Sequence, residues 1–129
     1  MNILVVDDEK MLVESIADTL SAYDAIRNVI KAYDGAQALQ KLSNQKFDII
    51  ILDIDMPRKS GLEILKFIRD DDLNSSAFVL MISGNFTPDY IKEATQSTKY
   101  FLAKPFKVNN LKEKLGQILL EKKKQASVA

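Results

Sequence analysis

The sequence of 129 residues contains no cysteine and no histidine. Without them the chain cannot form a disulfide, a zinc finger, a Cys–His nucleophile or a Ser–His–Asp triad. Any bound metal must therefore be held by oxygen ligands, which leaves hard cations such as magnesium possible. A chain of this length is expected to form one domain, because it is long enough to bury a core of its own.

An excess of charge of either sign is also missing, since 18 basic residues balance 18 acidic ones. This balance gives no bulk electrostatic reason to expect nucleic acid as a partner of this chain. No apolar run approaches the roughly 20 residues of a membrane span. The first residues pass from a short apolar run directly into acid and lack the basic region of a signal peptide. We therefore expect a cytoplasmic protein that binds neither nucleic acid nor membrane.

Short apolar runs alternate along the chain with segments of helical periodicity. The runs of strand length are Ile3–Val6, Ala25–Ala32, Phe47–Leu52, Phe78–Ile82 and Tyr100–Ala103. The runs at 49–52 and 78–82 are apolar without alternation, which is typical of strands buried on both faces of a parallel sheet. Apolar residues recur at helical spacing after each of these runs. The weakest such segment, Pro88 to Thr98, predicts a short or mobile helix.

Five repeats of strand and helix predict an α/β fold, a doubly wound five-stranded parallel sheet with five helices on its two faces. We assign residues 1–120 to this single domain. Residues 121–129, which begin Glu-Lys-Lys-Lys, are expected to form a short basic C-terminal tail at a fraying helix end.

Polar residues follow four of the predicted strands, at the edge where doubly wound sheets bind their ligands. These strand exits are Asp7-Asp8-Glu9, Asp53-Ile54-Asp55, Ser83-Gly84-Asn85 and Lys104-Pro105. Each has an ordinary structural explanation, as a helix cap or a turn. Four complementary exits together instead indicate a cleft in which clustered carboxylates need a compensating cation, and oxygen ligands favour Mg²⁺. With Lys104 and Ser83 stabilising phosphoryl oxygens, the Asp53 carboxylate could attack phosphorus and form an aspartyl phosphate.

These motifs resemble the CheY-like receiver domain of bacterial two-component response regulators over nearly the whole chain. The acidic opening Ile3-Leu-Val-Val-Asp-Asp-Glu9 and the segment from Asp53 through Met56-Pro57 to Gly61 match the family pattern, as do Asp34-Gly35 and Lys104-Pro105-Phe106. The resemblance implies a flavodoxin-like strand order 2-1-3-4-5 and a cis peptide between Lys104 and Pro105.

The resemblance further implies a role for each site residue. Asp53 is the phosphoacceptor, and Ser83 and Lys104 contact the phosphoryl group. Asp8 and Asp53 bind Mg²⁺ through their side chains, Asp7 helps through water, and Asp55 offers its backbone carbonyl. The domain catalyses its own phosphorylation at Asp53 and slow autodephosphorylation, and is not expected to be a dedicated enzyme.

The implied output is a switch. Ser83 is drawn toward the phosphoryl group, Phe101 repacks, and the surface of the fourth helix, fifth strand and fifth helix changes its affinity for a downstream protein target. The implied donor is a sensor histidine kinase or a histidine phosphotransfer protein, because this chain has no histidine of its own. We expect a monomer or a weak dimer formed on phosphorylation. The sequence is compatible with a stand-alone receiver, a phosphorelay intermediate or a fragment of a larger regulator.

The sequence departs from the family pattern at three places. Phe101 stands where the family often has Tyr. Because Phe lacks the tyrosine hydroxyl, an inward movement of its ring must be driven by packing and not by a hydrogen bond. Ser97-Thr98 replaces a common Gly-Ala before the fifth strand, and Asp55 adds an acid two residues after the acceptor. We expect the charge of Asp55 to weaken the approach of an anionic donor or to alter hydrolysis.

Two other functions compete with the receiver interpretation. Asp53-Ile54-Asp55 also resembles the Asp-x-Asp of haloacid-dehalogenase-like phosphatases, although in that family the Asp-x-Asp strand comes first and the second acidic pair late. A pseudo-receiver that is never phosphorylated would use the same fold as a binding scaffold, but such proteins usually lack one of the key groups. A flavin carrier is disfavoured because three acids stand where a phosphate-binding loop is needed.

Overall fold

The computed structural model describes residues 1–56 and 59–128 as one α/β unit. Its strands are β1 (Asn2–Val6), β2 (Asn28–Ala32), β3 (Ile49–Asp53), β4 (Phe78–Ser83) and β5 (Tyr100–Ala103). Its helices are α1 (Lys10–Ser21), α2 (Gly35–Asn44), α3 (Gly61–Asp70), α4 (Pro88–Ala94) and α5 (Val108–Val128). The strands are all parallel and lie in the order β2-β1-β3-β4-β5, which confirms the predicted architecture.

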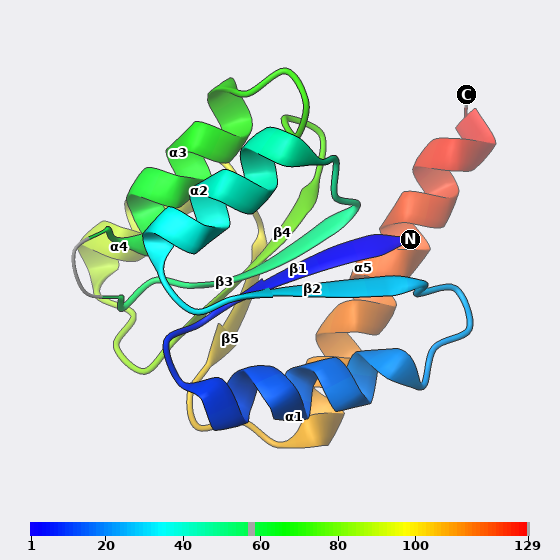
Figure 1. Ribbon diagram of the computed structural model, residues 1–129, viewed down its shortest axis with the longest axis horizontal. Helices are drawn as coiled ribbons and strands as arrows, with labels where there is room; N and C mark the ends of the chain where they lie inside the picture. The colour runs from blue at the N-terminus through cyan, green and yellow to red at the C-terminus, as the bar shows by residue number, and fades with distance from the viewer. Residues whose placement is uncertain (57–58, 129) are drawn as a thin grey trace.

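Helices cover both faces of the sheet, with α2, α3 and α4 on one face and α1 and α5 on the other (Figure 1). Alternate residues of each strand therefore enter two separate hydrophobic clusters. Leu4 and Leu52 pack with the α2–α3–α4 layer, whereas Ile3 and Ile51 pack with the α1–α5 layer. All five residues of β3 are buried, which explains why its sequence is a continuous apolar run that ends in a single acid.

Two predicted strands begin later in the structure than the apolar runs suggest. The run Ala25–Ala32 contributes a strand only from Asn28, because the preceding turn is fixed by the first residue: Met1 donates to the Ala25 carbonyl and accepts from Arg27. Phe47 is buried but precedes β3, and its backbone N–H donates to the Asn74 side chain instead of a neighbouring strand. Both runs contain apolar residues that fill the core from loops.

The weak fourth helix is short, as predicted. The Thr87 side chain caps its N-terminus by accepting from the Tyr90 N–H, Pro88 occupies the first turn, and the helix ends at Ala94. By contrast, α5 continues through Val128, so the described part of the segment 121–129 is helical. Lys122 on this extension pairs with Asp48 at 3.1 Å. Ala129 lies outside the described residues.

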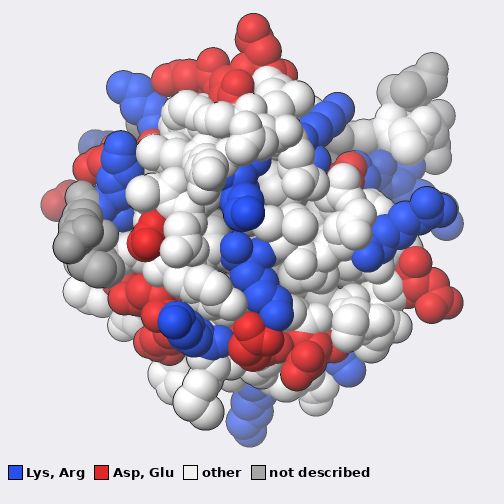
Figure 2. Space-filling model, viewed as in Figure 1, with Lys and Arg blue, Asp and Glu red and all other residues white. Residues whose placement is uncertain are grey.

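Charges of both signs are spread over the surface face shown in Figure 2, in agreement with the balanced composition. Among the described helices, none has the length and hydropathy needed to cross a bilayer.

Candidate phosphorylation site

The carboxyl ends of four neighbouring strands bring together the polar residues that the sequence places at strand exits. Asp7 follows β1, Asp53 ends β3, Ser83 ends β4 and Lys104 follows β5. The order β1-β3-β4-β5 makes these four ends adjacent, since parallel strands present their carboxyl ends at the same edge of the sheet. The peptide between Lys104 and Pro105 is cis, as the family resemblance implies.

Three carboxylates form a compact acidic cluster at this edge. Asp7, Asp8 and Asp53 each offer one oxygen, and these oxygens lie within 4.8 Å of one another. The side chains of Asp7 and Asp53 are 0% and 1% exposed, whereas Asp8 is exposed. Backbone N–H groups hold the two buried acids: Glu9 donates to Asp7 Oδ1 and Asp55 donates to Asp53 Oδ1, each at 3.0 Å.

Lys104 supplies the positive charge that faces this cluster. Its Nζ lies 2.8 Å from Asp7 Oδ2, 3.3 Å from Asp53 Oδ2 and 3.8 Å from Glu9 Oε1. Asp7 Oδ2 is buried, and its close partner among the described residues is this ammonium. One ammonium therefore serves several carboxylates, and the site is short of positive charge.

The pKa values of the site reflect this shortage. Burial raises the pKa of Asp53 to about 6; the Asp7 charge acts in the same direction, while the Asp55 N–H and Lys104 oppose it. Burial and the neighbouring Asp7 also raise the pKa of Asp8. The pKa of Lys104 is raised as well, because burial, which lowers it, is outweighed by the contact with Asp7 and the charges of Asp53 and Glu9. A second cation would relieve the cluster.

The Ser83 hydroxyl lies at the same edge but is already engaged. Ser83 is 0% exposed, and its Oγ donates to Asp55 Oδ2 at 2.6 Å while accepting from the Asn85 N–H at 2.9 Å. From the sequence, Asp55 is predicted to act through its backbone carbonyl and through the charge of its side chain. The structure adds a direct contact between its carboxylate and Ser83, which residue spacing alone does not reveal.

Gly61 holds the segment that follows the acceptor close to the backbone of β3. Its N–H donates to the Ile54 carbonyl at 3.0 Å. A Cβ at this position would lie 2.4 Å from the Asp53 carbonyl oxygen and 2.7 Å from Ile54 Cα, so any side chain would displace the end of the strand. Pro57, which belongs to the same family motif, lies outside the described residues together with Arg58.

An aromatic pair lies beside the Ser83 segment. Phe101 on β5 is half-buried, and its ring meets that of Phe86 edge-on, with centroids 5.7 Å apart at an angle of 86°. Phe86 follows Ser83 by three residues, so the predicted switch residues are joined through this loop. No motif in the sequence predicts a role for Phe86 or Asn85, although both lie in the turn after Ser83.

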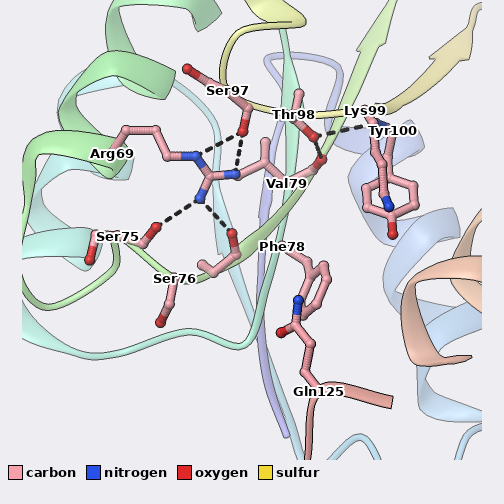
Figure 3. A pocket seen from close by; sticks show the side chains of 11 residues that line it. Arg69, Ser75, Ser76, Phe78, Val79, Ser97, Thr98, Lys99, Tyr100 and Gln125 are labelled. Atoms are coloured by element: carbon pink, nitrogen blue, oxygen red, sulfur yellow. Dashed lines mark hydrogen bonds between the residues drawn. The ribbon is translucent and has the colours of Figure 1, made fainter. Parts of the chain in front are cut away.

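The Ser97-Thr98 departure is explained at the opposite end of the sheet. The Thr98 hydroxyl donates to the Val79 carbonyl. The guanidinium of Arg69, from the last turn of α3, donates twice to the Ser97 carbonyl and once each to the carbonyls of Ser75 and Ala77, as the dashed lines in Figure 3 show. The role of Arg69 leaves no signal in the sequence, because a basic residue in a last helical turn is common.

Comparisons with known proteins agree on one family. The model of the response regulator receiver domain matches residues 3–116. The chain is 34% identical over 119 residues to the chemotaxis protein CheY of Pseudomonas aeruginosa, covering 92% of this chain and 95% of that protein.

Solved structures give the same answer for the fold. Chemotaxis protein CheY4 of Vibrio cholerae superposes with a TM-score of 0.81 at 30% identity, covering 91% of this chain and 97% of that one. A CheY-like receiver domain protein from Methanospirillum hungatei reaches a TM-score of 0.87 at 24% identity, covering 96% of this chain and 97% of that chain. The chain belongs to the response regulator receiver domain family, whose members act as phosphorylation-based signalling switches.

Proposed function

We propose that this receiver domain is switched by transfer of a phosphoryl group to Asp53. The observation that carries the proposal is the placement of one buried carboxylate, Asp53, beside a second buried acid, Asp7, and the ammonium of Lys104, which contacts both. Asp53 ends a central strand and its Oδ1 is fixed by the Asp55 N–H. Such a fixed nucleophile suits phosphoryl transfer, which depends mainly on positioning and charge stabilisation.

The acidic cluster is suited to hold Mg²⁺. Its donors are all oxygens, as Mg²⁺ prefers, and a single ammonium, that of Lys104, is shared among them. Asp8 and Asp53 would bind through their side chains, Asp7 directly or through water, and Asp55 through its backbone carbonyl. The bound cation supplies positive charge that offsets the oxygens of an incoming phosphoryl group.

The residues of this chain then perform the transfer. A bond forms between an Asp53 carboxylate oxygen and phosphorus as the bond between phosphorus and the donor breaks, and the electron pair of that bond leaves with the donor. The Lys104 ammonium, freed from part of its pairing with Asp53, binds the phosphoryl oxygens. The Ser83 hydroxyl becomes a further donor to the same group.

The donor and the target are both other molecules. We expect a sensor histidine kinase or a histidine phosphotransfer protein as donor, approaching over the open groove of about 470 Å³ beside Lys104 that is lined by Leu12, Pro105 and Phe106. Movement of Ser83 and repacking of the Phe86–Phe101 pair would alter the α4–β5–α5 surface and thus the affinity for a protein target.

The test is incubation with acetyl phosphate and Mg²⁺ followed by intact-mass measurement. We expect wild type to gain one phosphoryl group and Asp53→Asn to gain none. Asp72→Asn, which removes an exposed acid far from the cluster, should behave as wild type. Loss of the gain in the presence of EDTA would support the metal site. Continuous release of phosphate from phosphomonoesters without a phosphorylated protein would instead support the phosphatase alternative, and absence of both reactions would support the scaffold.

A further inference from the structure

In the unphosphorylated protein the hydroxyl proton of Ser83 is already donated in a hydrogen bond. A serine hydroxyl has one proton to donate. Here that proton is directed to Asp55 Oδ2 at 2.6 Å, while the Asn85 N–H occupies the oxygen from the other side at 2.9 Å. Ser83 cannot donate to a phosphoryl group on Asp53 until this contact with Asp55 is broken.

Asp55 contacts both the phosphoacceptor Asp53 and the switch residue Ser83. Its backbone N–H donates to Asp53 Oδ1 at 3.0 Å, and its carboxylate receives the proton of Ser83 from the neighbouring strand end. The ends of β3 and β4 are therefore joined through one residue that contacts the acceptor by its backbone and the switch residue by its side chain. The remainder of the Asp55 side chain is exposed, so it can turn into water when the contact is lost.

We infer that Asp55 is a positioning residue that holds Ser83 in the unphosphorylated arrangement and competes with the phosphoryl group for its proton. The inference rests on the proposed phosphorylation of Asp53 and deepens it. Hydrogen bonds to ionised acceptors are stronger than neutral ones, so the contact with Asp55 opposes switching. A phosphoryl group on Asp53 repels the Asp55 carboxylate and offers Ser83 an acceptor of higher charge, so phosphorylation itself opens the contact.

The release of Ser83 has a physical route to the output surface. The Asn85 N–H is bonded to Ser83 Oγ, and the next residue, Phe86, packs against Phe101 on β5. When Ser83 turns toward Asp53, the loop that carries Asn85 and Phe86 loses an anchor and the aromatic pair can repack. The strength of the Asp55–Ser83 contact thus sets how far a given level of phosphorylation shifts the switch.

The test compares Asp55→Ala and Asp55→Asn in two backgrounds, one with Ser83 and one with Ser83→Ala. Each full-length protein is saturated with Mg²⁺ and titrated with beryllofluoride, which stands for the aspartyl phosphate. The switched fraction is read from the backbone amide resonances of Asn85, Phe86 and Phe101. With Ser83 present, we expect Asp55→Ala to raise the ratio of switched to unswitched protein about fivefold, with Asp55→Asn between it and wild type. With Ser83→Ala, the effect of each substitution should be clearly smaller, because only the loss of the Asp55 charge remains.

Glu9→Gln is the matched control for charge. It removes one acid that also lies near Lys104, at 3.8 Å, but that does not contact Ser83. Its effect on the beryllofluoride titration should be the same with and without the Ser83 hydroxyl. If Asp55→Ala behaves in this way as well, its effect is purely electrostatic and the inference is wrong. Failure of wild type both to gain phosphoryl mass and to bind beryllofluoride would overturn the proposed function, and the inference with it.

Discussion

The two ends of the central sheet solve the problem of buried polar groups in opposite ways. At the carboxyl ends of the strands, Asp7 and Asp53 are buried beside a single ammonium that the two acids share. At the amino ends, Asn74 is equally buried, but both polar atoms of its amide are bonded to backbone groups. The first arrangement leaves the clustered carboxylates short of positive charge, whereas the second pairs the buried amide in full.

The amino end is held by polar side chains that bond to the backbone of neighbouring segments. Asn74 accepts from the Phe47 N–H at 2.8 Å and donates to the carbonyls of Leu42 at 2.9 Å and Gln45 at 3.1 Å. Arg69 joins α3 to the start of β4 and to the loop before β5 through carbonyls. These contacts fix the loops at this end of the sheet. Stability and function are therefore carried by different ends of the same strands.

The largest expected effect on stability is at Asn74. Asn74→Ala leaves one buried N–H, one buried carbonyl and one half-buried carbonyl without their partner, and should lower the free energy of unfolding by about 3 kcal/mol. Denaturant unfolding measures the loss, with Asn44→Ala on the exposed end of α2 as the matched control. The variant should still gain phosphoryl mass from acetyl phosphate. A loss of phosphorylation in folded Asn74→Ala would contradict the separation of the two ends.

Arg69→Met should have the next largest effect. It removes four hydrogen bonds from a half-buried guanidinium but keeps an apolar stem, so we expect a loss of about 2 kcal/mol. Amide hydrogen exchange should increase first in residues 95–99, because Ser97 loses two of the donors. Arg27→Met removes an exposed guanidinium and serves as the control. Unchanged exchange in this loop would show that Thr98 alone holds it.

A substitution at the carboxyl end should do the opposite and stabilise the fold. Because the pKa of Asp53 is raised from 3.8 to about 6 in the native state, the native state favours the protonated carboxyl. The stability that the protonated Asp53 carboxyl contributes is fully present below about pH 3.8 and is lost as the pH rises through about 6. In EDTA at pH 7.5, Asp53→Asn should therefore raise the free energy of unfolding by about 1–2 kcal/mol.

The pH dependence gives a second check on Asp53. In EDTA, the free energy of unfolding of wild type should rise relative to that of Asp53→Asn as the pH falls from 7.5 to 5. The free energy of unfolding of Asp72→Asn should follow that of wild type throughout. Addition of Mg²⁺ at pH 7.5 should stabilise wild type and have a much smaller effect on Asp53→Asn, since the variant loses one ligand of the cluster. A constant difference between wild type and Asp53→Asn across this range would mean that Asp53 titrates normally.

The smallest expected effect is at Asp48, at the amino end. The pKa of this carboxyl is lowered, because burial, which would raise it, is outweighed by the Asn2 N–H and Lys122. Its contribution is therefore present above about pH 4 and is lost as pH falls below the unfolded value. Asp48→Asn should cost about 0.5–1 kcal/mol at pH 7 and almost nothing near pH 2.5. An equal cost at both pH values would assign the effect to packing and not to charge.

Much of the fold could be predicted because buried strands appear in the sequence as continuous apolar runs. The apolar runs at 49–52 and 78–82 identify central strands, and single polar residues at their ends identify the functional edge of the sheet. β2 and β3 begin later than the apolar runs predict, since Ile26 and Phe47 are apolar residues that lie in loops and are buried in the core. An apolar residue indicates that its side chain is buried, but it does not indicate whether its backbone pairs with a neighbouring strand.

The strand–helix alternation, the acids at the ends of β1 and β3, and the complementary Ser83 and Lys104 are all visible in the order of residues along the chain. The pairing of these groups is not: in the folded protein Lys104 lies closer to Asp7 than to Asp53, and the Ser83 proton goes to Asp55. The reason is that Asp55 and Ser83 are 28 positions apart, so their contact depends on strand register and loop path and on no local pattern. The local sequence specifies which functional groups the site contains, and tertiary packing sets how these groups are paired in the unphosphorylated protein.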